Sequence, residues 1–341
     1  MNIIIALIVL SVIIMVHEFG HFMTGKMVGI YAEEFSIGMG PRLLKYEGKD
    51  TVYSLRALPI GGYVKFLGED DNSNDPRAFN NVAVWKRCLV VVSGALMNFV
   101  FAIILLSILF STHGIYIPSP TIAEIIEDSP AHIAGIQKDD IIVAIDNIDL
   151  SNIDVEDAVE TIREVLNKNG SKPTTIEVIR NEEHKTFTVI PQYDEDTNLY
   201  LIGIKFGYEL KKLGIGRSIV MAISNIGKMS VIMLKFLGNL IFKHEGIEDI
   251  VGPVGIVGEI GKAAQAGAEQ LINLAIIISL NLGIINLVPF PALDGGRLLL
   301  LIIEGVRGKP IDREKEGLIN LIGFVLLLLL MIVVTFKDIA G

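Results

Sequence analysis

The chain has 341 residues, of which 51% are hydrophobic and 20% are charged, and its formal net charge is −10. Its mean hydropathy of +0.54 lies well above the soluble range and predicts an integral membrane protein. The acidic balance, without a basic stripe, argues against nucleic acid as a partner, and the single cysteine, Cys88, excludes an intrachain disulfide and a cysteine-based zinc site.

Residues 3–28 form the first predicted element, an apolar transmembrane helix that contains His17-Glu18-Phe19-Gly20-His21. The pattern H-E-x-x-H on a helix places two imidazoles one turn apart on one face, where both can bind one zinc ion. The intervening Glu18 is then close enough to act as general base on a zinc-bound water. Because ionisable groups at membrane depth are costly, their presence here indicates a hydrolytic metal site within a bilayer.

The next segment, about residues 33–68, is a predicted re-entrant β-hairpin on the cytoplasmic side. Its sequence alternates on both sides of Glu47-Gly48-Lys49-Asp50, which is typical of a hairpin turn, and it contains the glycine pair Gly61 and Gly62. Non-helical apolar backbone near a membrane must be buried in protein or line a wet cavity. We therefore expect the hairpin to lie close to the helix that carries His17.

Residues 89–110 form the second predicted transmembrane helix, which contains Ser93-Gly94-Ala95-Leu96-Met97-Asn98. Small residues permit close packing of membrane helices, and a buried amide can form hydrogen bonds between them. Asn98 therefore has two open interpretations, an interhelical contact or a contact in the active site.

A soluble domain is predicted at residues 118–195, where short alternating strands surround one amphipathic helix, Val155–Leu166. This pattern favours a small α+β or partly open barrel domain. Residues 196–268 are a predicted linker with an amphipathic helix at about 214–242. This helix is expected to lie at the membrane interface, because its apolar sequence is interrupted by Arg217, Lys228 and Lys235.

Two further apolar segments, about 271–290 and 318–336, complete a predicted membrane domain of four helices. Lysines and arginines are concentrated in the loop between the first and second helices and in the loop between the third and fourth, so both loops are expected in the cytoplasm. The soluble domain is then extracytoplasmic. We expect a multi-pass protein of the cell membrane with its active site toward the cytoplasmic leaflet.

Two histidines make an incomplete site, because catalytic zinc usually has three protein ligands and keeps a fourth position for water. The candidate third ligand is Asp294, a lone acid near the cytoplasmic end of the third apolar helix, which Pro289 and Pro291 break. His17 lies roughly 21 Å into the first helix, and the third helix spans roughly 26 Å in the same direction, so both reach the inner leaflet. The alternative role of Asp294 is a cap for the helix that begins at Gly295.

Three segments together resemble the motifs of the site-2 protease family of intramembrane zinc metalloproteases: His17–His21, Gly94–Asn98 and Asn286–Gly296. The glycine-rich hairpin and a single PDZ-like module narrow the resemblance to the bacterial RseP/RasP type, and it covers almost the whole chain. The implied fold is a polytopic α-helical membrane protein with four transmembrane helices, a cytoplasmic-side re-entrant β-hairpin and one extracytoplasmic PDZ-like α+β domain.

The resemblance implies a zinc-dependent endopeptidase that cuts single-pass membrane proteins, such as anti-sigma factors or signal-peptide remnants, within or near the lipid bilayer. In this family His17, His21 and Asp294 would ligate Zn2+, and Glu18 would activate water. The hairpin would bind an unwound substrate segment by strand addition. The candidate substrate-binding residues are Gly61, Gly62, Asn98, Asn281 and Asn286.

The PDZ-like module would restrict access to substrates that another protease has already shortened outside the membrane. It lacks a clear G-L-G-F loop for binding a peptide carboxylate, so capture of peptide termini and a steric filter are both open. Two rival functions are a membrane transporter, whose broken helix and buried acids would move ions, and a catalytically inactive PDZ scaffold with structural zinc. No oligomeric state follows from the sequence.

Overall fold

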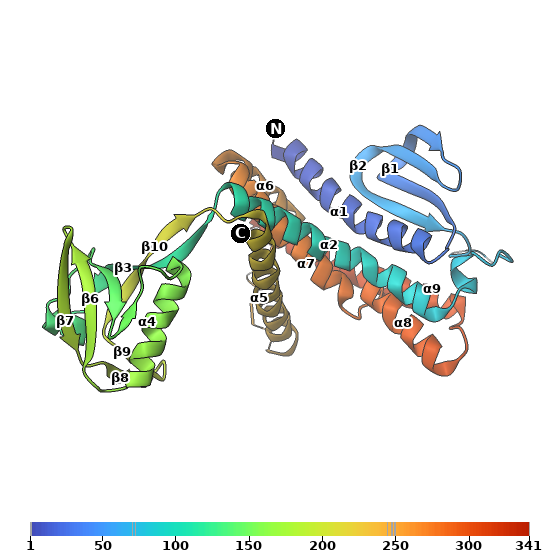
Figure 1. The fold of residues 1–341 in the computed structure, drawn as a ribbon. Helices are drawn as coiled ribbons and strands as arrows, with labels where there is room; N and C mark the ends of the chain where they lie inside the picture. The colour runs from blue at the N-terminus through green and yellow to red at the C-terminus, as the bar shows by residue number, and fades with distance from the viewer. Residues whose placement is uncertain are drawn as a thin grey trace. The chain divides into compact units, whose positions relative to one another are not determined.

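The structure is a computed structural model that describes residues 2–69, 71, 73–243, 245, 246, 248 and 250–340. The chain divides into two compact units. The helical unit comprises Met1–Ser111 together with Gly214–Gly341, and the sheet unit comprises Thr112–Leu213. Each unit is described by itself below, with the element labels of Figure 1.

The helical unit is built from long apolar helices and one β-hairpin (Figure 1). Among the described residues, five helices are long and apolar enough to cross a membrane. They are α1 (Asn2–Met27), α2 (Val84–Thr112), α5 (Ile215–Lys243), α7 (Ala268–Leu287) and α9 (Arg313–Ala340). The shorter helices of this unit are η1 (Phe79–Asn81), α6 (Pro253–Ala266) and α8 (Asp294–Arg307).

Four of the five long helices coincide with the predicted spans, and α5 coincides with the predicted interfacial helix. The most apolar window of α5 has a mean hydropathy of 1.5, the lowest value among the five helices. Length and composition make a helix a candidate span, but they do not distinguish a span from a helix on the membrane surface. The number of four transmembrane helices therefore stays a prediction.

The hairpin consists of β1 (Ala32–Glu47) and β2 (Val52–Phe66). Both strands are long and bend, so different parts of the same two strands pair in two separate registers. Ser36, in the first part of β1, pairs with Ser54 on one side and with Tyr63 on the other. Nearer the turn, Tyr46 pairs with Tyr53. The two strands thus form a compact sheet whose neighbouring segments are, in order, 42–47, 52–56, 34–37 and 62–66.

The sheet unit combines short antiparallel strands with one long helix (Figure 1). Its main sheet has the strand order β10-β3-β4-β6-β7, with β5 beside β4. Buried isoleucines from the strands, such as Ile122, Ile142 and Ile176, pack with Ile162 of α4 in one core. The elements are β3 (Ile115–Ile125), α3 (Pro130–Ala134), β4 (Ile141–Ile145), β5 (Ile148–Asp149), α4 (Val155–Asn169), β6 (Thr174–Arg180), β7 (Glu183–Val189), β8 (Gln192–Asp194), β9 (Leu199–Leu201) and β10 (Ile204–Lys211).

The predicted linker differs from the structure at both ends. We predict a linker from residue 196, but β9 and β10 lie within 196–213 and belong to the sheet unit. β10 pairs antiparallel with β3, for example Tyr208 with Pro118, a contact between segments far apart in the chain that local periodicity cannot reveal. The C-terminal part of the same predicted linker contains the helix α6.

Candidate metal centre

The first helix supplies two imidazoles and a carboxylate to one region of the helical unit. His17 and His21 lie one turn apart on α1, and their ring centroids are 4.8 Å apart with the rings edge to face. Both side chains are largely shielded, with exposed fractions of 7% and 13%. The apolar helix α1 therefore carries these two histidines on a face that is packed against protein.

Asp294 brings a third possible ligand atom to the same point. It is the first residue of α8, and its Oδ2 lies 3.0 Å from His17 Nε2 and 3.4 Å from His21 Nε2. The two Nε2 atoms are themselves 3.2 Å apart. The cap position of α8 is occupied by Leu293 and the Asp294 carboxylate faces the imidazoles, so the alternative role of a simple helix cap is not what the structure shows.

The size of this triangle can be compared with the geometry of bound zinc. Three ligand atoms at 2.0–2.1 Å from a zinc ion, in tetrahedral arrangement, are about 3.3–3.4 Å from one another. The three edges of 3.0, 3.2 and 3.4 Å lie within a few tenths of an ångström of that value. Asp294 Oδ2 is also buried and makes no hydrogen bond within the described residues. The three side chains therefore fit a divalent cation such as zinc.

α2 approaches α1 closely enough to contact the Nδ1 atoms of both histidines, which lie opposite their candidate ligand atoms Nε2. His21 Nδ1 lies 2.8 Å from the main-chain oxygen of Val90, and His17 Nδ1 lies 3.2 Å from Asn98 Nδ2. Between these two contacts, a Cβ atom on Gly94 would lie 2.3 Å from His21 Nε2 and 2.8 Å from His17 Nε2. A glycine is therefore required at position 94, because any side chain would occupy the space of the ligand atoms.

Glu18 lies beside the last segment of the hairpin. A Cβ atom on Gly62 would lie 3.7 Å from Glu18 Cγ, so the β2 backbone passes directly alongside this carboxylate. A cavity of about 170 Å³ is lined by the three candidate ligands, Glu18, and hydrophobic residues of β2 and α2, including Val64 and Val90. The arrangement places a possible general base, a possible metal and space for a reacting group in one pocket.

A second, larger cavity of about 710 Å³ shares three lining residues with the first: Glu69, Phe79 and Arg297. Arg297 forms an ion pair with Glu69 and lies over the Phe79 ring, 4.5 Å from its centroid. In the sequence, Arg297 is recognisable only as one positive charge of a loop predicted to be cytoplasmic. Its position one turn after Asp294 on α8 is the signal that could have placed it near the site.

The predicted substrate-binding residues do not all gather at the cavity. Gly62 lies next to Glu18, and Gly61 precedes it with a φ of +76°. Asn281 is exposed and Asn286 is half-buried on α7, and neither is among the residues that line the smaller cavity. Asn98 is fully buried behind His17, likewise outside that lining.

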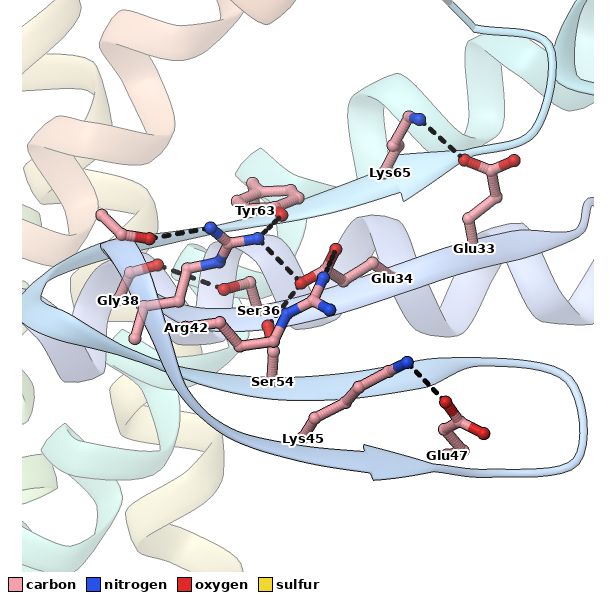
Figure 2. Close-up of polar contacts among 12 residues, drawn as sticks. Glu33, Glu34, Ser36, Gly38, Arg42, Lys45, Glu47, Ser54, Tyr63 and Lys65 are labelled. Carbon is pink, nitrogen blue, oxygen red and sulfur yellow. Dashed lines mark hydrogen bonds and ion pairs between the residues drawn. The ribbon is translucent and has the colours of Figure 1, made fainter.

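Glu34, a buried carboxylate outside the cavity, lies in the hairpin and is partnered within the chain. Figure 2 shows it between Arg42 and Ser54, which donate hydrogen bonds of 2.8 and 2.5 Å, and Arg56 adds a third of 3.0 Å. Arg56 also donates to the hydroxyl of Tyr63. Through these contacts Glu34 connects all four segments of the hairpin sheet.

The comparisons with known proteins identify the family of the chain. Residues 5–330 match the model of peptidase family M50. A protein of Clostridium acetobutylicum, whose name places it among zinc metalloproteases, is 39% identical over 99% of this chain and 97% of its own length. The zinc metalloproteases RasP of Geobacillus kaustophilus and Oceanobacillus iheyensis are 29% and 30% identical over 98% of this chain, and over 96% and 97% of their own lengths. The chain belongs to peptidase family M50.

Proposed function

We propose that this chain is a zinc-dependent intramembrane endopeptidase that hydrolyses peptide bonds of single-pass membrane proteins within or near the membrane. Its family and the zinc metalloproteases among its relatives support a metalloprotease that uses Zn2+. The observation that carries the proposal is the triangle of His17, His21 and Asp294 ligand atoms beside Glu18, reached from an apolar helix long enough to span a bilayer.

In the proposed reaction His17, His21 and Asp294 bind the metal, and Glu18 acts as the general base and then as the general acid. Zinc, when bound, supplies a Lewis acid and lowers the pKa of a water molecule toward neutrality. Glu18 takes a proton from the attacking water and delivers it to the nitrogen of the leaving amine. With three protein ligands and an adjoining cavity, the site has the open form of a catalytic centre rather than the closed four-ligand form of a structural one.

The hairpin is the proposed binding surface for an unwound substrate segment. Helical peptide bonds are shielded by their own hydrogen bonds, so a membrane helix must open before it can be cut. Residues 62–66 pair with 32–37 on one side, and within the described residues no strand pairs with their other side. The same strand segment lies against α1, and its Gly62 lies next to Glu18, so a substrate strand added at the unpaired edge would lie near the site. Asn281 and Asn286 are proposed to hold the opened backbone on the α7 side.

The topology we propose has four transmembrane helices, with α5 at the interface, in a multi-pass protein of the cell membrane. The site then faces the cytoplasmic leaflet, and the sheet unit is an extracytoplasmic PDZ-like module. A cavity of about 530 Å³ in this unit is lined by residues of α4, β9 and β10, including Arg163, Tyr200 and Phe206. Such a cavity suits either capture of a shortened substrate end or a steric filter.

The test is cleavage by purified protein in lipid vesicles. A single-pass substrate, already shortened on its outer side, is reconstituted with the wild-type protein or with Glu18→Gln, at equal measured zinc content. We expect the wild type to produce fragments whose new ends map by mass spectrometry to the membrane segment, and Glu18→Gln to cleave at least about 100-fold more slowly.

Cleavage that survives the Glu18→Gln substitution at an unchanged rate would overturn the proposed mechanism. Absence of cleavage by the wild type, together with zinc- or proton-dependent ion flux across the vesicles, would favour the rival transporter instead.

A further inference from the structure

Asn98 on α2 lies next to the His17 ring, on the side opposite its candidate ligand atom Nε2. None of its surface is exposed, and its Nδ2 lies 3.2 Å from Nδ1 of His17. Its Oδ1 is buried and makes no hydrogen bond within the described residues. A buried amide oxygen without a partner is costly, so the orientation of this amide has a measurable consequence.

The chemistry of a metal-binding histidine specifies what Asn98 must offer. The ligand atom of His17 is Nε2, which faces His21 and Asp294. A neutral imidazole that binds a metal through Nε2 carries its hydrogen on Nδ1 and must donate it. An amide NH2 group cannot accept this hydrogen, whereas the amide oxygen can. A half-turn of the Asn98 amide exchanges its two ends, which are nearly equal in size, and brings Oδ1 to His17.

The contact of His21 on the same helix supports this orientation. His21 Nδ1 lies 2.8 Å from the main-chain oxygen of Val90, a group that can only accept. Val90, Gly94 and Asn98 are spaced four residues apart, so they share one face of α2. That face presents an acceptor to His21, the open space at Gly94, and then a side chain to His17.

We propose that Asn98 is a positioning residue whose amide oxygen accepts the Nδ1 hydrogen of His17 and holds the ring with Nε2 toward the metal. This proposal rests on the proposed function, in which His17, His21 and Asp294 bind zinc. Partners of this kind fix the tautomer and orientation of a metal-binding histidine, and their loss typically weakens metal affinity 10- to 100-fold. Asn98 thereby acts through His17, without contact with the substrate.

The test compares substitutions that distinguish loss of the hydrogen-bond acceptor from a change in side-chain volume. Asn98→Asp keeps the size and offers only acceptors, whereas Asn98→Leu keeps approximate size and offers none. Ser279→Ala is the matched control, because the Ser279 hydroxyl donates to the main-chain oxygen of Asn98 at 3.0 Å and links α7 to α2 without contacting a histidine. The readout is the dissociation constant for Zn2+, measured by chelator competition on the purified full chain, with the absorption spectrum of the Co2+ form as a second measurement.

We expect Asn98→Leu to bind Zn2+ about 10- to 100-fold more weakly than the wild type and to show an altered Co2+ spectrum. Asn98→Asp and Ser279→Ala should both stay within about threefold of the wild type. Unchanged affinity in Asn98→Leu would overturn the proposal, and so would an equal loss in Asn98→Asp and Asn98→Leu. A wild type that binds no stoichiometric Zn2+ would instead contradict the proposed function, so the two failures are distinguishable.

Discussion

Two carboxylates of the helical unit are largely shielded from solvent and have different partners: Glu34 in the hairpin, and Asp294 in the proposed metal centre, whose Oδ2 atom is buried. Glu34 receives hydrogen bonds from Ser54, Arg42 and Arg56, so the chain itself supplies its donors and its positive charge (Figure 2). Asp294 Oδ2 meets the Nε2 atoms of His17 and His21 and has no hydrogen bond within the described residues. Glu34 is therefore paired within the chain, whereas we propose that a bound cation pairs Asp294.

This difference distinguishes an acid that is paired within the chain from one that we propose to bind a metal. A buried charge is tolerated only when it is paired and hydrogen-bonded, because its desolvation is expensive. At Glu34 the two arginines meet this requirement, and the result is a connected sheet. In the proposed zinc site the nitrogens that neighbour Asp294 donate lone pairs to the metal, and the bound metal would supply the positive charge that pairs this carboxylate. Acid-to-amide substitutions at the two positions should therefore have different effects.

Asp294→Asn should have the larger effect, and it should fall on zinc. The amide has the shape of the carboxylate but lacks its charge, so the protein should fold while one of three ligands is lost. Sharing a zinc-binding free energy of about 10–16 kcal/mol among four ligands gives roughly 2.5–4 kcal/mol for one, or about 100- to 1000-fold in affinity. Chelator competition with the purified protein measures this change.

Hydrogen exchange of the hairpin amides is the companion measurement for this variant, and it should not change. If Asp294→Asn kept wild-type zinc affinity, Asp294 would have to be removed from the ligand set. If the hairpin lost protection as well, the two carboxylates would not be independent and the comparison itself would fail.

The two carboxylates also differ in how much of their surroundings can be predicted from the sequence. Asp294 follows from chemistry and topology, because an H-E-x-x-H helix lacks a third ligand and a lone acid lies in a broken apolar helix at the matching depth. Glu34 is not predicted, since its partners are 8, 20 and 22 residues away and meet only because β1 and β2 each pair twice. Local alternation predicts the turn of the hairpin but not this second pairing.

The contact between His17 and Asn98 could not be predicted from the sequence with certainty, for a related reason. These residues are 81 positions apart, and the small residues of α2 indicate close helix packing without giving the register. A shift of one residue along α2 would turn Asn98 away from His17. The same limit applies to β10, because its partner in the sheet, β3, is far away in the sequence.

Glu34→Gln should have the smaller effect of the two amide substitutions, and it should fall on the hairpin. The amide can still accept from Ser54, but it loses the charge that pairs with Arg42 and Arg56. Hydrogen bonds to charged groups contribute about 1.5–3 kcal/mol each, and the partial exposure of both arginines reduces this, so we expect the opening free energy of the hairpin amides to fall by about 1–3 kcal/mol. Hydrogen exchange measures this free energy.

Glu47→Gln is the matched control for Glu34→Gln, because Glu47 pairs with Lys45 at the exposed turn of the same hairpin. Its effect should stay within about 0.5 kcal/mol. Zinc affinity should be unchanged in both variants. Equal protection in Glu34→Gln and Glu47→Gln would show that the Glu34 contacts do not hold the sheet together.

The pH dependence of the hairpin gives the smallest effect and the sharpest assignment. Burial would raise the pKa of Glu34, but hydrogen bonds from Ser54, Arg56 and Tyr63 and the charge of Arg42 outweigh it and lower the pKa from 4.5 to about 2. Because the folded pKa is the lower one, the stabilisation is complete above about pH 5 and is lost as the pH falls from about 4.5 toward 2.

Between pH 6 and pH 3, the hairpin amides of the wild type should therefore lose about 1–2 kcal/mol of opening free energy, since one pKa unit corresponds to about 1.4 kcal/mol. The same pH change also releases zinc, so the wild type must be compared with Glu34→Gln, in which the metal is lost equally but the Glu34 titration is absent. The difference between the two proteins isolates Glu34. An identical pH profile for both proteins would show that the titration of Glu34 does not stabilise the hairpin, which would contradict this prediction.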